Sequence, residues 1–303
     1  MRTVCQCISP HLIDGIQALV APSSDPLFGQ KQMIGGNMPR DGGNLILNQE
    51  DCAIAKSIKE LRPYIRPFLG SKELLTNKNL WCLWMVDAPE DVFCIPFVSA
   101  RLEKCRQSRL ASKANSTRDA AKFPHLFVQR PQPENARCLA VPVASSENRY
   151  RLPMAFIESN VVANNCVLLI PNADIYDFGI LSSRMYNVWL LTVSGRLELR
   201  IHYSRSMCYN TFPWPKQNPV KSIERISKRI LQERKKQKLT LGDMYRPALM
   251  PKSLKDIHNE LDAEVDLLYS AGGFKSDFER LCCLMKLYEN RVKYKMFGIN
   301  KWC

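Results

Sequence analysis

The stretch from Gly179 to Pro215 constrains the fold most, because three structural patterns follow one another within it. Apolar residues recur at helical spacing from Ile180 to Val193, which predicts a helix with one buried face. Gly195 breaks this pattern, and residues 197–203 then alternate apolar and polar, as a half-buried strand does. The stretch ends in the proline-punctuated sequence NTFPWP at residues 210–215, which indicates a domain boundary.

One face of the predicted strand carries polar side chains of unusual variety. Glu198, Arg200 and His202 are two residues apart from one another, so they would share that face. The face combines a hydrogen-bond acceptor, a forked donor and an imidazole. A surface salt bridge between Glu198 and Arg200 is the alternative interpretation, since such pairs are common on strands.

The charge of the chain favours a polyanionic partner, most often nucleic acid. The 43 Lys and Arg residues outnumber the 29 Asp and Glu residues, which gives a formal net charge of +14. The hydrophobic fraction of 46% and the charged fraction of 24% are those of a globular protein rather than a disordered one. A length of 303 residues accommodates one large or two ordinary domains.

The cysteines predict neither a disulfide framework nor a zinc site. The chain has 12 of them, but no C-x-x-C motif occurs, and most lie within apolar runs. Small buried hydrophobic side chains in a reducing cytoplasm explain them best. We find neither a signal peptide nor an apolar run of membrane-spanning length, so we expect a cytoplasmic protein with no membrane partner.

Two segments of the first half invite a phosphate-binding interpretation. Residues 35–43 contain two glycine pairs, which form either a tight structural turn or a contact with a DNA backbone. Residues 98–122 form a basic, helix-like run with few large apolar residues. This run is either a solvated helix or a helix that faces phosphates.

The middle of the chain predicts strands separated by polar loops. Residues 125–128, 138–143, 154–157 and 166–170 have strand-like composition, and residues 80–85 predict a further buried strand. The intervening loops at residues 145–151 and 164–165 are rich in amides and forked donors, the side-chain types that read base edges.

After Pro215 the pattern becomes wholly helical. A basic helix is predicted over residues 221–238, a second helix over 254–269 and a third from a capping box at residues 276–279. We therefore predict an α+β fold in which a mixed domain, residues 1–215, precedes an all-helical domain, residues 216–303.

Several phrases of the sequence together resemble one family of proteins. They include IGGNMPRDGGNLIL, LRPYIRPFLGSKELL, FPHLFVQR, the long stretch that contains SSRMYNVWLLTVSGRLELR, and GGFKSDFERLCCLMKLYE. In order and over nearly the whole chain, they are similar to the C-terminal part of MmeI-like, or YeeA-like, DNA methyltransferases. These are S-adenosylmethionine-dependent adenine-N6 enzymes of restriction–modification systems.

The resemblance implies a target recognition domain and a C-terminal helical domain without the catalytic domain. The family's glycine-rich S-adenosylmethionine loop and its Asn-Pro-Pro-aromatic motif do not occur, and the only Asn-Pro here is followed by valine. We therefore expect no catalytic residue, no cofactor and no metal in this chain. The expected partner is double-stranded DNA, and a separately encoded methylase or nuclease subunit is a further candidate.

The resemblance also implies roles for particular residues. Glu198 and Arg200 match base-reading positions, with His202 where arginine is common. Glutamate accepts from cytosine N4–H and arginine forks onto guanine, so the pair should read a C·G base pair. Five further residues match the other loops that approach the bases: Ser146, Glu147, Arg149, Asn164 and Asn165. We assign the phosphate backbone to Arg101, Lys104, Arg106, Arg109, Arg184 and Arg205.

Three functional hypotheses remain open on the sequence. The first is a recognition module that is not catalytic alone. The second is DNA (adenine-N6) methyltransferase activity in complex with a separate catalytic subunit. The third is an inert truncated remnant, which would expose large apolar patches and aggregate.

Overall fold

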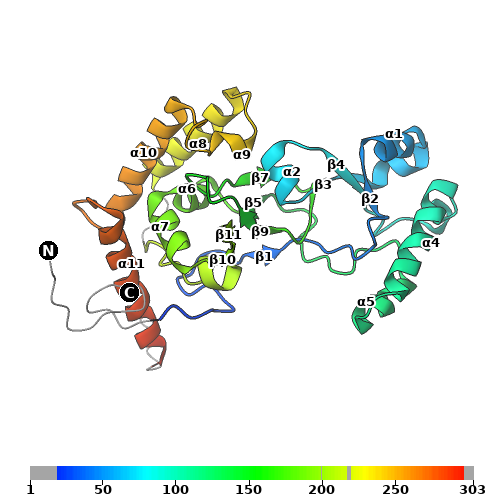
Figure 1. Ribbon diagram of the computed structural model, residues 1–303, viewed down its shortest axis with the longest axis horizontal. Coiled ribbons are helices and arrows are strands. Elements are labelled where there is room, and N and C mark those ends of the chain that lie inside the picture. The colour runs from blue at the N-terminus through cyan, green and yellow to red at the C-terminus, as the bar shows by residue number, and fades with distance from the viewer. Residues whose placement is uncertain (1–18, 199, 217–219, 297–303) are drawn as a thin grey trace. The chain divides into compact units, whose positions relative to one another are not determined.

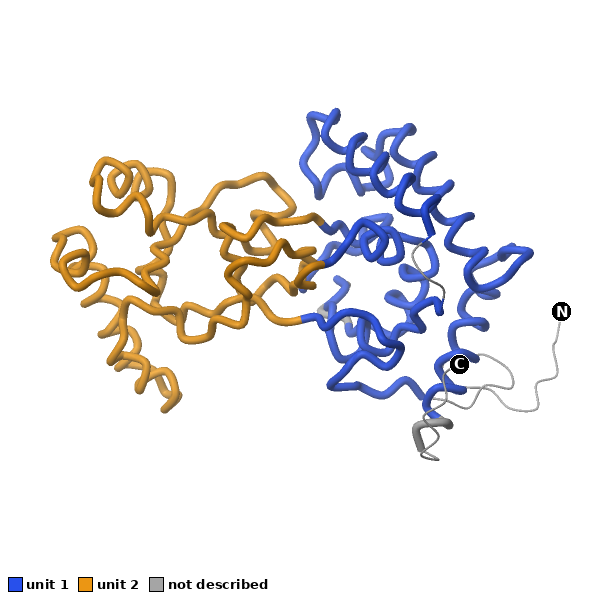
Figure 2. Tube along the Cα trace, turned by 180° about the vertical axis from the view of Figure 1, so that it is seen from behind, with its two compact units in different colours: residues 1–33, 143–154, 173–303 blue, residues 34–142, 155–172 orange. Residues whose placement is uncertain are grey.

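The computed structural model describes residues 19–198, 200–216 and 220–296. They form two compact units that interleave along the chain (Figure 1 and Figure 2). Unit 1 comprises residues 1–33, 143–154 and 173–303, and unit 2 comprises residues 34–142 and 155–172. The mixed α/β region followed by a helical C-terminal region confirms the predicted α+β fold class. The predicted domain boundary at Pro215 stays a prediction. The two compact units do not divide the chain there, since unit 1 includes residues on both sides of Pro215.

Unit 2 is built on two four-stranded sheets. One has the order β1-β9-β5-β7 and is antiparallel throughout, whereas the other has the order β2-β4-β3-β8 and joins β3 to β8 in parallel. The strands are β1 (Ile34–Gly35), β2 (Ile46–Leu47), β3 (Ile65–Leu69), β4 (Leu80–Leu83), β5 (Cys138–Pro142), β7 (Ala155–Ile157), β8 (Val162–Ala163) and β9 (Val167–Pro171).

In unit 2, side chains of the helices and of the second sheet form one hydrophobic cluster. The cluster includes Leu45, Leu83, Trp84, Val98 and Phe127, all of them buried. The helices are α1 (Gln49–Ser57), η1 (Lys59–Tyr64), α2 (Ser71–Thr76), α3 (Glu90–Phe93), α4 (Pro96–Leu110), α5 (Asn115–Asp119) and η2 (Ala120–Lys122). Residues 125–128 do not form the predicted strand, so that prediction is wrong. The ring of Phe127 instead lies edge-on to the ring of Trp84, with the ring centroids 5.2 Å apart.

The glycine cluster of residues 35–43 leads into a structural turn held by two buried charged side chains. The Asp41 carboxylate accepts hydrogen bonds from the backbone N–H groups of Gly43 and Leu45, at 3.0 and 2.5 Å. The guanidinium of Arg109, which is 1% exposed, donates to the carbonyl oxygens of five residues at 2.6–2.9 Å: Pro39, Arg40, Ala120, Phe123 and Leu126. The assignment of Arg109 to DNA phosphates is therefore corrected, since no donor of this side chain faces solvent.

Unit 1 is mainly helical and carries one small sheet, of order β10-β11-β6. Helix α8 packs on α6 and α10, while α11 packs on α7. The elements of unit 1 are β6 (Ala144–Ser145), α6 (Ile175–Ser182), α7 (Arg184–Val193), β10 (Gly195–Leu197), β11 (Arg200–His202), the π-helical turn η3 (Arg205–Tyr209), α8 (Lys221–Lys236), α9 (Leu241–Met244), α10 (Lys252–Leu267) and α11 (Asp277–Met296).

The helix predicted from Ile180 to Val193 is two helices, α6 and α7, that meet at Ser183. Ser183 is extended, with φ −79° and ψ 163°, and its hydroxyl accepts from the N–H of Tyr186 at 3.3 Å. A serine side chain that caps a new helix competes with continuation of the old one. The apolar spacing is preserved across the break, which is why periodicity alone did not reveal it.

Helix α7 is the central element of unit 1. Trp189 is fully buried, with its indole N–H donating to the Thr211 hydroxyl at 3.3 Å and its ring 5.8 Å from that of Tyr288 on α11. Phe212 stands edge-on to Tyr186 at 4.9 Å. The proline-rich exit predicted at residues 210–215 therefore folds back onto α7 instead of leading away from it.

Gly179 permits the close approach of α6 to α8. A Cβ atom at this position would lie 2.4 Å from the Ser227 hydroxyl oxygen and 2.8 Å from a methyl carbon of Ile223. We expect Gly179→Ala to lower the free energy of unfolding by about 1–3 kcal/mol through overpacking. Chemical denaturation measures this. Gly272→Ala is the matched control, because nothing lies within 4 Å of a Cβ there, and equal losses in both variants would contradict the explanation.

Candidate nucleic-acid interface

The strand predicted over residues 197–203 is instead a β-hairpin with Glu198 in its turn. Strands β10 and β11 pair antiparallel, with Gly195 opposite His202 and residue 197 opposite Arg200. Glu198 has a φ of +57°, in the left-handed region that non-glycine residues seldom adopt. Arg200 and His202 remain exposed on one face of β11, while Ile201 between them is buried.

The turn brings Glu198 and Arg200 together, although they do not share a strand. The Arg200 guanidinium donates to the Glu198 carboxylate at 2.6 Å, and the side chains are 52% and 73% exposed. This hydrogen bond raises the pKa of Arg200, with smaller contributions from the charges of Glu198 and Glu147. The structure thus contains the ion pair of the alternative interpretation, in an exposed position at the tip of a hairpin.

The loop at residues 146–150 lies beside the hairpin. It continues from β6, whose Ser145 pairs with Ile201 and whose Ala144 pairs with His202. Ser146 and Glu147 are at least partly exposed in it. Arg149 is more constrained, since its guanidinium donates to the Gly242 carbonyl at 3.1 Å and the Ser145 hydroxyl at 3.2 Å. Burial, followed by the nearby charge of Arg246, lowers the pKa of Arg149.

The base of the hairpin is fixed to the core of unit 1. The N–H of Tyr203 donates to the Val143 carbonyl at 2.7 Å, which extends the pairing of β11 with β6. The hydroxyl groups of Tyr203 and Tyr186 hydrogen-bond to each other inside the protein. Burial raises the pKa of both phenols well above its ordinary value. Both therefore stay protonated, and the pair links the hairpin to α7.

A set of buried, hydrogen-bonded polar side chains supports the loop at residues 146–150. The backbone N–H of Tyr150 donates to the Tyr245 carbonyl at 2.7 Å. The Tyr245 hydroxyl lies 2.8 Å from Nε2 of His258, and Arg234 donates to the same hydroxyl at 2.8 Å through Nε. Arg234 also donates to the Met154 carbonyl at 2.7 Å. The hydrogen bonds of Tyr150 to Tyr245 and of Arg234 to Met154 join residues far apart in the sequence, so composition and periodicity gave no signal for them.

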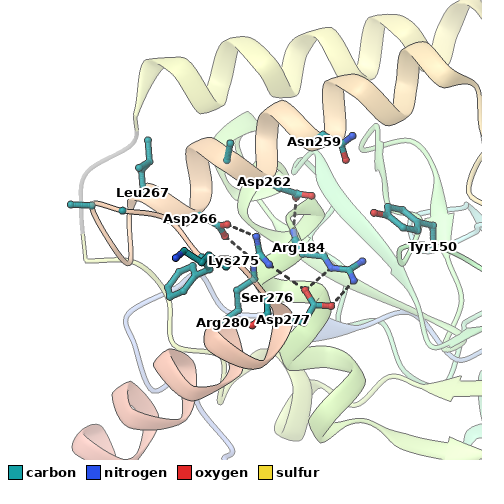
Figure 3. Close-up of a pocket in the computed structure, with 15 residues that line it drawn as sticks. Tyr150, Arg184, Asn259, Asp262, Asp266, Leu267, Lys275, Ser276, Asp277 and Arg280 are labelled. Carbon is teal, nitrogen blue, oxygen red and sulfur yellow. Dashed lines mark hydrogen bonds and ion pairs between the residues drawn. The ribbon is translucent and has the colours of Figure 1, made fainter.

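Arg184, predicted to contact phosphate, belongs to an ion-pair network. Its guanidinium donates to both carboxylate oxygens of Asp277, at 2.9 and 2.5 Å, and its backbone N–H donates to Asp262 at 2.7 Å (Figure 3). Asp262 also pairs with Arg151, and Arg280 bridges Asp277 and Asp266. The network lines an open pocket of about 730 Å³ and connects α7, α10 and α11. Asp277 thus occupies two of the three guanidinium nitrogens of Arg184, Nε and Nη2.

The other side chains predicted to contact phosphate differ in exposure and in the protein partners that they already have. Arg205 is exposed and donates one hydrogen bond, to the Met33 carbonyl at 3.2 Å. In unit 2, Lys104 is exposed and Arg106 pairs with Glu103 on the surface of α4. Arg101 is paired with Asp51 and donates to the Asn44 carbonyl at 3.0 Å.

Asn164 and Asn165 follow β8 in unit 2. The Asn164 side-chain oxygen accepts from the N–H of Cys166 at 2.8 Å, so this amide shapes its own turn, whereas Asn165 is exposed. Since the two asparagines and the hairpin belong to different units, the structure groups only the hairpin and the 146–150 loop as one surface. The role of the asparagines stays a prediction.

The described part of the chain contains no cluster of three or more His, Cys, Asp or Glu residues that could hold a metal ion. Among the same residues, no helix is both long and apolar enough to cross a membrane.

Comparison with known proteins identifies the family. A sequence model of the MmeI target recognition domain matches residues 14–216, and a model of the MmeI C-terminal domain matches residues 215–295. The chain belongs to the MmeI family. The resemblance inferred from its sequence motifs is thereby confirmed.

Two relatives of known name show how much of an MmeI-family protein this chain represents. It is 36% identical over 290 residues to DNA methyltransferase A of Bacillus subtilis (strain 168), covering 94% of this chain and 33% of the relative. It matches a solved structure of the Type IIL restriction-modification enzyme MmeI in complex with DNA, with a TM-score of 0.89 and 35% identity. That match covers 95% of this chain and 39% of the MmeI chain. The chain therefore spans between a third and two fifths of these relatives.

The buried His258 makes the stability of this MmeI-family chain depend on pH. Burial, with the charges of Arg151 and Arg234, lowers the pKa of His258 well below its ordinary value, so the folded protein keeps it neutral. The unfolded chain binds a proton below about pH 6.5, and stability therefore falls as the pH falls through that value.

We expect the free energy of unfolding to decrease between pH 7.5 and 5.5, with His258 contributing up to about 1.4 kcal/mol per pH unit below its unfolded pKa. His258→Gln should remove this part of the slope in urea denaturation. His125, whose pKa burial also lowers, accounts for a separate part that the variant retains. An unchanged slope in His258→Gln would show that this histidine is already charged in the folded protein.

Proposed function

We propose that this chain recognises a specific sequence in double-stranded DNA for an adenine-N6 methyltransferase of a restriction–modification system. It belongs to the target recognition family of MmeI, and a solved relative with the same fold is an MmeI complex with DNA. The formal net charge of +14 supports a polyanionic partner. We place its action in the cytoplasm, where bacterial DNA lies.

The exposed Glu198–Arg200 pair is the observation that carries the proposal. A guanidinium fork fits O6 and N7 of guanine, and a carboxylate accepts from N4–H of cytosine, so the two side chains complement a C·G base pair. The hairpin presents both at its tip, more than half exposed. His202 lies on the same face of β11 as Arg200 and is available for a neighbouring position.

The ion pair seen in the free protein is compatible with this role. Exposed salt bridges contribute little to stability, because solvent screens them and ordering two long side chains costs entropy. Their rearrangement toward a base pair therefore sacrifices little.

In this proposal, exposed cations contact the DNA phosphates. Lys104, Arg106 and Arg205 keep this role, because their side chains face solvent at least in part. Arg101 and Arg184 are less available, because each is already paired with a carboxylate. Phosphate contacts position a protein on the duplex without carrying sequence information.

We assign the methyl-transfer step to protein outside this sequence. The 303 residues contain neither a glycine-rich S-adenosylmethionine loop nor an Asn-Pro-Pro-aromatic motif, the elements that bind the cofactor and orient a flipped adenine in the family. A methylase domain or subunit would supply that step, and a nuclease would be a further partner. With such a subunit, the chain would form part of an active methyltransferase.

Exchanging the charges of the hairpin pair tests base reading. In the double variant Glu198→Lys, Arg200→Asp, we expect the preferred base pair at one position of the bound sequence to change. Discrimination against the original base pair should shift by roughly 10- to 100-fold, while non-specific affinity stays similar. Selection from a randomised DNA library followed by competition binding measures this.

Arg137 and Glu158 form the matched control pair. They are the same residue types, 3.3 Å apart, with exposures of 53% and 71%. The exchange Arg137→Asp, Glu158→Lys should leave the selected sequence unchanged. If instead the hairpin variant weakens binding equally for all sequences, Glu198 and Arg200 contact phosphate or serve the fold, and the proposed base reading is rejected.

The absence of catalysis is tested by incubating the purified chain with tritiated S-adenosylmethionine and unmethylated DNA. We expect no methyl transfer and no saturable binding of the cofactor, because the motifs for both are missing. Retained sequence-specific DNA binding in the same preparation separates a recognition module from an inert, aggregating remnant. Methyl transfer by the chain alone would refute its assignment as non-catalytic.

A further inference from the structure

Helix α8 exposes a stripe of cations that neither the hairpin nor the fold accounts for. Lys221, Arg225, Lys228 and Lys235 are exposed, with Gln232 among them. Successive spacings of four, three, four and three residues place all five on one narrow face of the helix. We call these five residues the α8 stripe.

The α8 stripe lies opposite the face that holds the helix in unit 1. Ile223, Ile226 and Ile230 are buried, and α8 packs on α6 and α10 through that side. The stripe therefore points away from the core of unit 1. Several of its members also line one open surface hollow, together with Glu224 and Arg229.

Neighbouring carboxylates do not neutralise the α8 stripe. Helix α8 carries seven basic and two acidic residues, whereas the adjacent α10 carries two basic and five acidic ones. The acidic residue Glu260 of α10 pairs with Arg229, at the edge of the stripe, at 2.5 Å. Lys236, also beside the stripe, pairs with Glu233 at 3.3 Å. Within the described residues, no ion pair engages the four cations of the stripe itself.

Part of the arrangement is unfavourable for an isolated helix, although Glu224 in the first turn and Lys235 in the last turn suit the helix dipole. Lys221 occupies the first turn, where the helix dipole disfavours positive charge. Lys221, Arg225 and Lys228 follow one another at spacings of four and three, so like charges repel along the stripe. A bound polyanion would remove both penalties.

The length of the stripe suits double-stranded DNA. From residue 221 to residue 235 the helix rises about 21 Å. That length runs alongside about six phosphates of each strand of a duplex. A membrane surface is a poorer match, because an interfacial helix needs an exposed apolar face beside its cations, and α8 buries its isoleucines.

We propose that the α8 stripe binds the phosphate backbone of double-stranded DNA, independently of sequence. The inference rests on the proposed function for its choice of ligand, but assigns a second surface, on the helical C-terminal region. This surface contributes affinity and salt dependence, whereas the hairpin contributes sequence preference.

The test uses the full chain with Lys221, Arg225, Lys228 and Lys235 all replaced by glutamine. Glutamine retains high helix propensity, so α8 should remain folded, which circular dichroism and thermal unfolding verify. We expect affinity for any duplex to fall on the order of 10- to 100-fold, and the slope of log affinity against log salt to decrease by about 3. The preferred sequence and the ratio of specific to non-specific binding should not change.

A control variant removes the same charge elsewhere in unit 1. Lys252, Lys255, Lys275 and Lys286 are exposed but dispersed over α10, α11 and the segment between them. Their replacement by glutamine should lower affinity far less. The variant Lys221→Arg, Lys228→Arg, Lys235→Arg keeps the charge of the stripe and should bind as the original chain does.

The outcomes separate this inference from the proposed function. An unchanged salt slope in the stripe variant, or an equal loss in the dispersed control, would overturn the inference while leaving sequence recognition intact. A chain that shows no sequence preference, yet loses non-specific affinity only when the stripe is removed, would support the inference and overturn the proposed function.

Discussion

The hairpin of β10 and β11 is joined to helix α7 by the buried hydroxyl pair of Tyr186 and Tyr203. Each strand of the hairpin has only three residues, and a short two-stranded hairpin is marginally stable in water by itself. The tyrosine pair joins its last residues to α7, which is buried by the aromatic packing of Trp189 and Phe212. The exposed tip that we propose to read DNA is therefore tied to buried aromatic residues of unit 1.

The sequence predicted the elements that depend on local chemistry. The helical C-terminal region, the capping box at its last helix and the polar character of residues 198–202 all follow from neighbouring residues. The break at Ser183 and the turn at Glu198 did not, because the apolar pattern continues through both. Glutamate is also a poor signal for a left-handed turn, which usually selects glycine or asparagine. The structure, not the periodicity, decides between a strand and a hairpin here.

The sequence could not show which arginines face solvent and which are paired inside the protein, because their partners are remote in the chain. Arg109 and Arg184 looked like solvent-facing cations in basic or helical segments. The first instead donates to carbonyl groups up to 70 residues away, and the second pairs with Asp277 across 93 residues. A buried guanidinium with several carbonyl partners holds loops together in the way that a metal ion would. Net charge therefore overstates how much positive surface this fold offers to DNA.

The left-handed conformation of Glu198 limits which residues the tip of this hairpin can carry. Asparagine, aspartate and glycine adopt a φ near +57° readily, whereas valine, isoleucine and threonine would be strained there. The residue at the tip can thus vary among small polar types at little structural cost, but not toward β-branched ones. Arg200, in ordinary strand conformation, has no such restriction. Under the proposed base reading, relatives that recognise other sequences should vary freely at the position of Arg200 and narrowly at that of Glu198.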